Sequence, residues 1–475
     1  MKISQLFKIY QDLLNSNISV QGWIQTARTQ KNDIFVKLND GTHPEGLQLI
    51  IDTQKFPDIS FTTGTSIKVE GTLIKSPAAG QLFELTVSKI DILGKCDPTE
   101  YPLSKNKMNL DTLRQYCHFR SRTSTFGSVF RIKSAISHST HQFMRDSGFL
   151  HLDPNIMTIN ECEGGAGVFQ VTEKDISVPS KLPLMIIDTS IIEDGKKIKS
   201  SQITDKYDWK QDHFGQPVFL TVSSQLSLEP LACALGSVYT MNKSFRSEHS
   251  CTNKHLSEFT HFELETCFVD NSDLMTIGED FIKYVASYIL RECAADVDNL
   301  DKFISKGLKE RIQTIVNCKF YRVSYKDAVE LAISNGKNIK YGEDLSSEIE
   351  NFLTDFYKGP VFVFNWPIAI KSFYMKQDEV DTTLCNNFDL LMPYKVGELI
   401  GGSMREDCYD KLMFMLKKKG INPEPLKFYT DLRKFGSVPH GGFGLGFDRL
   451  TMLFTGMENI KDTVPFPVSY KSCDF

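Results

Sequence analysis

Hydrophobic and polar residues alternate in five short runs between Ile18 and about Ile92, which is the pattern of half-buried β-strands. Turn-forming residues separate the runs, as at Asn39-Asp40-Gly41. Five short strands within roughly 80 residues predict a small β-barrel of the OB type, a barrel that commonly holds single-stranded nucleic acid. The runs are VQGWIQTAR, IFVKLND, LQLIID, SIKVEGTLIK and LFELTVSKIDIL.

Beyond residue 122 the pattern favours a larger domain of mixed structure. The run RIKSAISHSTHQFMRDSG has helical spacing, ends at Gly148 and precedes the extended run FLHLDP. Strand and turn patterns follow from 213 to 270, amphipathic helical patterns from 271 to 360, and strand patterns again from 361 to 450 before a final helix. Because helices and strands are grouped rather than alternating, they predict an antiparallel α+β domain.

The predicted organisation is therefore a barrel at 1–97, a hinge at 98–125 and an α+β domain at 126–475. Prolines and many polar residues mark the hinge as a connector. The lysine-rich segment 194–206 is expected to be a surface loop.

Composition narrows the class of protein. The chain has 475 residues, 41% of them hydrophobic and 24% charged, which fits two or three folded domains and excludes a disordered chain. No run approaches about 18 consecutive apolar residues and the N-terminus lacks a signal-peptide pattern, so we expect a soluble, cytoplasmic protein without a membrane partner. The 11 cysteines form no CxxC pair, which argues against a zinc ribbon. With a net charge of −5, binding of a nucleic acid would need a local basic surface.

Three side chains of the predicted barrel are candidate contacts for nucleic-acid bases. Phe35 offers a ring for stacking, while Lys37 and Gln48 offer polar contacts. The alternative is that Phe35 is a core residue of an alternating strand.

The first segment with candidate chemistry is Ser244-Phe-Arg-Ser-Glu248, which a polar loop separates from KHLSEF and FELE. Arg246 and Glu248 lie two apart in a strand-like run, so both project to one face. The arginine could hold a phosphate and the glutamate could accept from an exocyclic amine. A buried ion pair would give the same spacing.

Two later segments add metal and nucleotide chemistry. Asp389 and Glu398 offer hard oxygen ligands suited to Mg²⁺, Gly401 lets a ligand approach the backbone, and Arg405 provides a planar donor fork. The glycine-rich run PHGGFGLGFDR ends at Arg449 and precedes a helix, as nucleotide sites require. Alone, it could equally be a turn before a core helix.

Taken together, these segments resemble the class II aminoacyl-tRNA synthetases, within them the aspartate, asparagine and lysine group. FRSEHSCTNKHLSEF is similar to the second signature motif of that family, GFGLGFDRL to the third, and the helix and strand ending at Pro154 to the first. The barrel with GWIQTAR and LNDG is similar to the anticodon-binding OB domain. The resemblance covers nearly the whole chain and implies a class II catalytic domain built on an antiparallel sheet flanked by helices.

The resemblance also implies roles for individual residues. Arg246, Arg449 and Glu398 would be catalytic, Phe259 would stack on adenine, and Asp389 and Glu398 would hold Mg²⁺. The full set implied to bind ATP is Arg246, Ser247, Glu248, Lys254, His255, Leu256, Phe259, Glu398, Gly446, Phe447, Asp448 and Arg449. The set implied to bind the amino acid is Glu163, Ser223, Gln225, Arg246, Glu258, Gly401 and Arg405.

Within the amino-acid set, Arg405 would grip the side-chain carbonyl, and Glu258 is the candidate acceptor for a carboxamide NH₂. The chain departs from the family pattern at Lys254 and Val468, where arginine is usual. The first change keeps the charge but loses bidentate phosphate geometry, and the second puts one C-terminal contact in doubt.

The segments YTDLR, GSMRE and NIKDTVPFP favour the asparagine-specific members of the group. The expected function is ATP-dependent activation of asparagine and its transfer to tRNA(Asn), by a homodimer that uses ATP and Mg²⁺. An aspartate-specific or nondiscriminating enzyme is the closest alternative. A catalytically dead paralogue that only binds tRNA or protein is the alternative from another class, and the joint presence of the catalytic residues argues against it.

Overall fold

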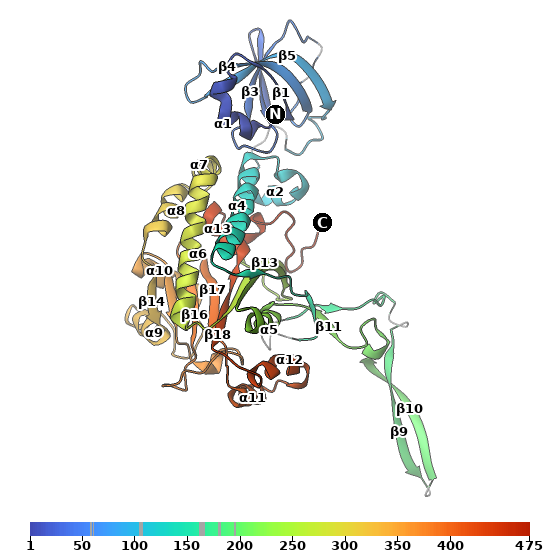
Figure 1. Cartoon of the computed structure of the whole chain (residues 1–475). Coiled ribbons are helices and arrows are strands. Elements are labelled where there is room, and N and C mark those ends of the chain that lie inside the picture. Colours follow the sequence, from blue (N-terminus) through green and yellow to red (C-terminus); the bar gives the residue numbers. More distant parts are fainter. Residues whose placement is uncertain (58, 60, 104–107, 161–166, 179–181, 194–195) are drawn as a thin grey trace.

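The computed structural model describes residues 1–475 apart from 58, 60, 104–107, 161–166, 179–181 and 194–195. Figure 1 shows a small barrel at the N-terminal end of the chain, joined by short helices to a larger body of helices and strands. A two-stranded hairpin extends from that body. Among the described residues, no helix is both long and apolar enough to cross a membrane.

The N-terminal barrel is closed and has the strand order β1-β2-β3-β5-β4. Alternate residues point inward, such as Val36 and Leu38, and helix α1 adds Ile3 and Leu6 to the same core. The predicted five-stranded barrel is confirmed, whereas α1 was not expected. Its elements are α1 (Ile3–Leu13), β1 (Asn17–Gln30), β2 (Asp33–Asn39), β3 (Leu47–Asp52), β4 (Ser66–Lys75) and β5 (Phe83–Gly94).

Two short helices and one long helix follow the barrel. They are α2 (Leu110–Arg114), α3 (Cys117–Arg120) and α4 (Ser124–Asp146). The Thr123 hydroxyl accepts from the amide of Phe126 and so caps the start of α4. The predicted hinge, 98–125, spans the stretch between the end of β5 and the start of α4.

The larger body is built on an eight-stranded sheet with the order β14-β15-β16-β17-β18-β13-β12-β6. Neighbouring strands run antiparallel except at two pairs, β14 with β15 and β12 with β6. This agrees with the predicted antiparallel α+β architecture. The strands are β6 (Leu150–His151), β12 (Ser237–Phe245), β13 (Glu258–Cys267), β14 (Tyr321–Ser324), β15 (Val361–Phe364), β16 (Asn387–Met392), β17 (Gly397–Met404) and β18 (His440–Gly446).

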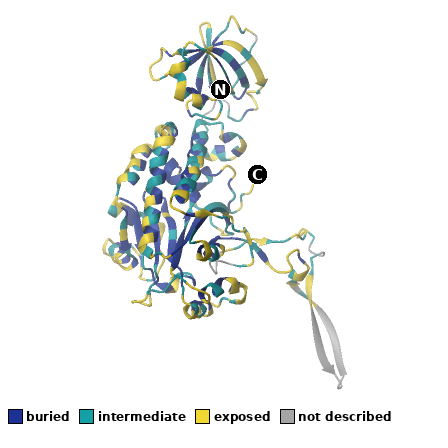
Figure 2. Ribbon diagram, viewed as in Figure 1, coloured by how far each residue is buried: buried dark blue, intermediate teal, exposed yellow. Residues whose placement is uncertain are grey.

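Helices cover one face of this sheet and bury its main core. Phe262 and Leu264 of β13, together with Phe443 of β18, pack there against helices such as α4 and α6. Figure 2 shows the strands buried between the more exposed surfaces of the helices. The helices of the body after α4 are α5 (Gln225–Leu235), α6 (Asn271–Glu292), α7 (Ala294–Phe303), α8 (Leu308–Asn317), α9 (Tyr325–Ser334), α10 (Ser347–Tyr357), α11 (Tyr409–Lys418), α12 (Lys427–Thr430) and α13 (Phe447–Thr455).

Two regions differ from the sequence prediction. Segment 213–270 was predicted to contain strands and turns, but it also contains helix α5. The helix was not predicted because it has Pro230 in its interior, where proline is unfavourable. The lysine-rich segment 194–206 is not simply a loop, because β9 (Leu184–Glu193) and β10 (Lys196–Tyr207) pair as an antiparallel hairpin. The lysines of this segment suggested an exposed loop. The isoleucine-rich run before them has a high β-propensity and forms the partner strand.

Smaller elements complete the body. A three-stranded sheet contains β7 (Met157–Thr158), β11 (Val218–Leu220) and β8 (Gln170–Val171). The short 3₁₀ turns are η2 (Trp209–Gln211), η3 (Ile368–Ile370), η4 (Glu424–Leu426), η5 (Asp431–Arg433) and η6 (Ile460–Asp462).

Candidate active site

The face of the large sheet opposite the main helical layer carries the candidate chemistry. Because side chains alternate along a strand, the residues of β13 that do not enter the core share this face. They are Phe259, His261, Glu263 and Glu265. Strand β18, which pairs with β13, places Gly442 opposite Glu265 and Gly444 opposite Glu263.

These glycines are required by their neighbours. A Cβ on Gly444 would stand 2.5 Å from Nε2 of His261, and one on Gly442 would run into the Leu264 carbonyl and the Glu265 carboxylate. The lack of side chains on these two glycines therefore leaves room for His261 and Glu265 of β13 to lie over β18.

A cavity of 160 Å³ opens on this face at the ends of β13, β17 and β18. Five side chains that can carry positive charge line it, namely Arg246, Lys254, His255, His261 and Arg449. The guanidinium of Arg246 lies 5.5 Å from the ring centroid of Phe259, so a cation and an aromatic surface meet in the same space. This combination suits a nucleotide, because the ring can stack on a base and the cations can hold phosphates.

The cavity brings together most of the residues expected to bind ATP. Its lining includes Arg246, Glu248, Lys254, His255, Leu256, Phe259, Glu398, Gly446, Asp448 and Arg449. Two expected residues do not line it. Phe447 belongs to the hydrophobic core, and the Ser247 hydroxyl donates to the Val168 carbonyl at 3.3 Å.

Asp448 lines the cavity but is committed to structural contacts. Its carboxylate accepts from Lys133 at 2.5 Å and from the amide of Thr260 at 2.9 Å. These contacts position α13 against β13, and a contact of Asp448 with ATP stays a prediction.

The charges in the cavity favour an anion. Burial lowers the pKa of Lys254, and burial together with the charge of Arg449 lowers the pKa of His255. Both shifts mean that the positive forms lack enough nearby negative charge. A bound polyphosphate would supply that charge and would raise both pKa values again.

Two carboxylates converge next to the cavity. A Cβ built on Gly401 would lie 3.2 Å from Oε1 of Glu398 and 3.6 Å from Oδ1 of Asp389. The other oxygen of Asp389 accepts from Lys371 at 2.8 Å. Burial raises the pKa of Asp389 to about 6, although Lys371 lowers it. Two hard oxygens near one backbone position fit the donor set that Mg²⁺ prefers.

Farther along the same face, Arg405 and Glu265 form a buried, two-pronged ion pair. Nε and Nη2 of Arg405 donate to the Glu265 carboxylate at 3.1 and 2.5 Å, and Nη1 donates to the Ser403 hydroxyl at 2.6 Å. Burial raises the pKa of Glu265 to about 7, while Arg405 acts in the opposite direction. Arg405 was expected from the sequence to bind the amino acid, whereas its partner Glu265 was not.

The expected acceptor, Glu258, lies elsewhere. It is on the opposite face of β13 from Phe259, its side chain is 39% exposed, and it pairs with Lys243 at 3.2 Å. Glu265 lies seven positions further along the chain, which is about 23 Å along a strand. Glu258 and Arg405 are therefore not brought together. Strand alternation in EFTHFELETC could have identified Glu265 instead, because it shares a face with Phe259.

Ser223 and Gln225, two other residues expected to bind the amino acid, each donate a hydrogen bond to a buried glutamate. The Ser223 hydroxyl donates to Glu263, and Nε2 of Gln225 donates to Glu229 at 3.0 Å. Glu163 lies outside the described residues.

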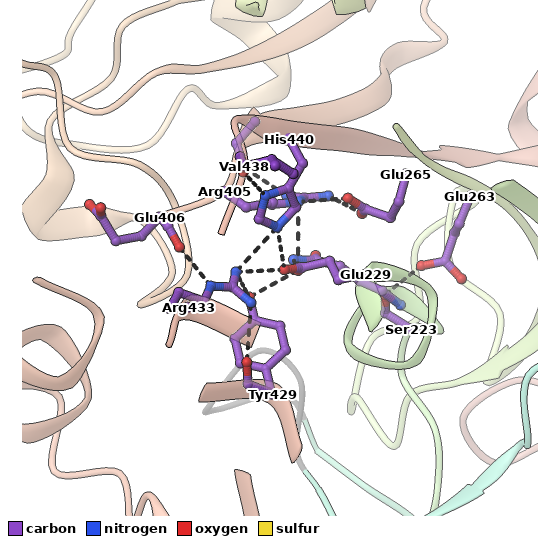
Figure 3. Close-up of polar contacts among 12 residues, drawn as sticks. Ser223, Glu229, Glu263, Glu265, Arg405, Glu406, Tyr429, Arg433, Val438 and His440 are labelled. Atoms are coloured by element: carbon purple, nitrogen blue, oxygen red, sulfur yellow. Dashed lines mark hydrogen bonds and ion pairs between the residues drawn. The ribbon is translucent and has the colours of Figure 1, made fainter. Parts of the chain in front are cut away.

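Glu229 is the centre of a buried group of polar residues (Figure 3), several of which lie in segments singled out from the sequence, although their grouping around Glu229 was not predicted. Its carboxylate accepts from Arg433 at 2.7 Å and from the Tyr429 hydroxyl at 2.9 Å, and it contacts Nε2 of His440 at 3.2 Å. We call these residues, with Arg405 and Glu265, the Glu229 cluster. Glu229 lies on α5. Its position was not predicted because the sequence pattern did not indicate that helix.

On the barrel, the three candidate base contacts share one outer surface. Lys37 of β2 faces Gln48 of β3, and Phe35 lies two residues from Lys37 on the same strand face. Phe35 is half-buried and is absent from the barrel core, and the guanidinium of Arg28 lies 5.5 Å from its ring centroid. The core interpretation of Phe35 is therefore wrong, whereas its contact with a base stays a prediction.

Comparison with known proteins agrees with this geometry. A model of the class II tRNA synthetases (D, K and N) matches residues 196–470. The chain is 39% identical to the asparagine–tRNA ligase of Protochlamydia amoebophila over 98% of this chain and 96% of that protein.

Two solved structures share the fold over nearly the whole chain. The asparaginyl-tRNA synthetase of Pyrococcus horikoshii complexed with asparaginyl-adenylate has a TM-score of 0.82 at 27% identity, covering 97% of both chains. The Entamoeba histolytica asparaginyl-tRNA synthetase in complex with asparaginyl-adenylate has a TM-score of 0.80 at 26% identity, again covering 97% of both chains. The chain belongs to the class II tRNA synthetases of the D, K and N group.

Proposed function

We propose that this chain is an asparagine–tRNA ligase. It activates asparagine with ATP to asparaginyl-adenylate and transfers the asparaginyl group to the 3′ end of tRNA(Asn). The similar proteins named above are asparagine–tRNA ligases or bind asparaginyl-adenylate. In this chain, the observation that carries the proposal is the buried Arg405–Glu265 pair on the face that also holds the nucleotide cavity.

That pair distinguishes asparagine from aspartate by charge. The two amino acids are nearly the same shape, so the site has to read one NH₂ against one O⁻. Arg405 alone would favour aspartate, because a guanidinium binds a carboxylate in a fork. Glu265 already occupies the fork, can accept from a carboxamide NH₂ and repels a second carboxylate. Glu265 thus takes the role that the sequence analysis gave to Glu258.

Activation needs positioning and charge compensation but no general base. The carboxylate of asparagine is already ionised at neutral pH and is a competent nucleophile toward the α-phosphorus of ATP. Arg246 would hold the α-phosphate and the reacting carboxylate, while Lys254, His255 and Arg449 would hold the outer phosphates. Phe259 would support the adenine ring. Pyrophosphate leaves with the bonding electrons of the broken P–O bond.

Asp389 and Glu398 would hold Mg²⁺, whose positive charge offsets charge on the phosphates when it is bound. Their oxygens converge at Gly401, at the edge of the nucleotide cavity. Lys371 balances the charge of Asp389 at that place.

The barrel would bind the anticodon of tRNA(Asn) through Phe35, Lys37 and Gln48. We further propose a cytoplasmic homodimer, as the family resemblance implies. Phe35→Ala should reduce kcat/KM for tRNA by about tenfold, since a stacked base is worth roughly 1–3 kcal/mol. Pyrophosphate exchange, which needs no tRNA, should stay unchanged. An unaltered kcat/KM for tRNA would refute the contact.

The decisive experiment is ATP–pyrophosphate exchange with asparagine or aspartate, followed by charging of tRNA(Asn). We expect exchange that depends on asparagine and is at most weakly supported by aspartate. Preferred exchange with aspartate would overturn the assignment in favour of an aspartate-specific enzyme, and equal exchange would indicate a nondiscriminating one. No exchange with either amino acid would indicate a protein that only binds.

A further inference from the structure

Glu229 has no part in the proposed reaction, yet it is the most heavily engaged carboxylate near the amino-acid site (Figure 3). Its side chain is fully buried, and Arg433, Tyr429 and His440 all contact it. Burial alone would raise its pKa, but the charge of Arg433 and the contact with His440 outweigh burial and lower the pKa. The guanidinium groups of Arg433 at 2.7 Å and Arg405 at 3.8 Å therefore favour the ionised form of Glu229.

This charge is directly connected to two residues proposed to hold asparagine. Oε1 of Glu229 accepts from Nε2 of Gln225 at 3.0 Å and lies 3.8 Å from Nε of Arg405. Through the first contact it orients an amide, and through the second it offsets part of the charge of the guanidinium. A change in the charge of Glu229 would alter the electrostatic potential at Arg405 and Gln225, where the substrate side chain would bind. The effect is strong because these contacts are buried.

The buried charges of the Glu229 cluster balance. Arg405 and Arg433 contribute two positive charges, and Glu229 and Glu265 contribute two negative charges. At about pH 8, with Glu265 ionised and His440 neutral, the net charge is zero, which suits a neutral carboxamide. Without the charge of Glu229 the cluster would have a net positive charge, because neither guanidinium can lose its proton near neutral pH. A net positive charge would favour binding of a substrate carboxylate.

We propose that Glu229 is a specificity-determining residue that acts through Arg405 and keeps the site neutral, so that asparagine is preferred over aspartate. The proposal rests on the assigned function and extends it to a residue behind the substrate contacts. A purely structural role for Glu229 is the competing explanation, since removing any buried partner disturbs a cluster.

Charge and structure can be separated by a pair of substitutions. Glu229→Gln removes one negative charge and should raise the ratio of kcat/KM for aspartate to that for asparagine by about tenfold or more in pyrophosphate exchange. Adding Arg433→Met removes one positive charge, and the double variant should return toward the wild-type ratio. Arg433→Met alone should not raise the ratio. A structural role predicts the opposite order, because the double variant is the more disturbed protein.

A pH profile of the unmodified enzyme gives a second test that needs no variant. Burial lowers the pKa of His440, but the hydrogen bond and charge of Glu229 outweigh burial, so that the pKa is raised. On acidification from about pH 8 to about pH 6, protonation of His440 or Glu265 makes the cluster more positive. Relative use of aspartate should rise over that range. The charged or titratable groups around His440 are Glu229, Arg433, Arg405, Glu265, Tyr429, Cys233 and Cys267.

The outcomes are distinguishable. Wild-type enzyme without asparagine-dependent exchange would refute the proposed function itself. Asparagine-specific wild type combined with an unchanged ratio in Glu229→Gln, or with no recovery in the double variant, would refute only the role of Glu229. If Glu229→Gln fails to fold by circular dichroism, a flat pH profile of the wild-type ratio would refute the proposal and a rise in aspartate use at low pH would support it.

Discussion

Arg246 and Arg449 enter the nucleotide cavity from different parts of the chain, one after strand β12 and the other on helix α13. Arg449 is fixed in place by donating to the Glu398 backbone carbonyl at 2.7 Å. Such preorganised cations act where charge develops during phosphoryl chemistry.

We therefore expect Arg246→Ala and Arg449→Ala each to reduce asparagine-dependent pyrophosphate exchange by roughly a hundredfold or more, about 3 kcal/mol in the transition state. Circular dichroism should show that both variants remain folded, because neither residue belongs to the core. Near-normal exchange by either variant would refute the assignment of this cavity to ATP.

A second prediction at this scale concerns Glu265. Glu265→Gln removes the ionised acceptor beside Arg405, so the preference for asparagine over aspartate should fall by about tenfold or more. Glu258→Gln is the matched control, since Glu258 lies on the other face of β13 and pairs with Lys243. The measured quantity is the ratio of kcat/KM values in exchange. A larger effect from Glu258 than from Glu265 would contradict this account.

At the scale of elements, the C-terminal segment lies along the loop between β12 and β13. The amide of Ile460 donates to the Asn253 carbonyl at 2.8 Å, and the amide of Ser257 donates to the Val468 carbonyl at 2.8 Å. Val468 departs from the family pattern, but this contact uses only its backbone. At the tip, the rings of His249 and Tyr470 stack with centroids 4.8 Å apart.

We expect Tyr470→Ala to loosen this loop and to raise KM for ATP by about three- to tenfold, because an aromatic pair is worth roughly 0.5–1.5 kcal/mol. The loop carries Lys254 and His255, which would hold the phosphates. Tyr470→Phe keeps the ring and should behave like the wild type in exchange assays. Equal effects of both substitutions would show that the stacked rings do not position the loop.

Elements differ in how far their sequence reveals them. The barrel strands follow from alternation alone, because one side of each strand is buried and the other faces solvent. Helix α5 was not predicted because Pro230 lies within it. The position of Glu229, which belongs to α5, was therefore not predicted either. Glu265 was missed for another reason: its partner Arg405 is 140 residues away in sequence. Alternation along β13 places Glu265 on the same face as Phe259, but it does not identify Arg405 as the partner, because that depends on how the strands are ordered.

For the whole molecule, Arg131 links the barrel to the body. Arg131 of α4 donates to the Gly41 carbonyl in the barrel at 2.5 Å and to Asp296 of α7 at 2.8 Å. Nearby, the Arg122 guanidinium lies 5.2 Å from the ring centroid of Trp23. A cleft of 370 Å³ separates the two parts beside these contacts.

We expect Arg131→Lys to reduce kcat/KM for tRNA in charging by about fivefold while exchange stays normal. Lysine keeps the charge that Asp296 requires, but its single ammonium nitrogen cannot reach both partners as the separate Nη1 and Nη2 atoms of the guanidinium do, so the contact with Gly41 is lost. Charging measured at several tRNA concentrations, beside exchange without tRNA, separates the two effects. A parallel fall in both activities would mean that Arg131 supports the catalytic body rather than the barrel.

The order of strands in the sheet has a consequence for how the chain reaches its native state during synthesis. The core of the barrel uses residues 3 to 90, so it can fold as soon as those residues leave the ribosome. The large sheet cannot do the same, because β18 (His440–Gly446) lies between β17 and β13 in its middle. Strands synthesised early, such as β12 and β13, cannot complete their pairing at once. The edge of β13 that binds β18 stays unpaired until nearly the whole chain has been synthesised. We therefore expect nascent chains that end before residue 440 to contain a folded barrel and an unfinished body that depends on chaperones.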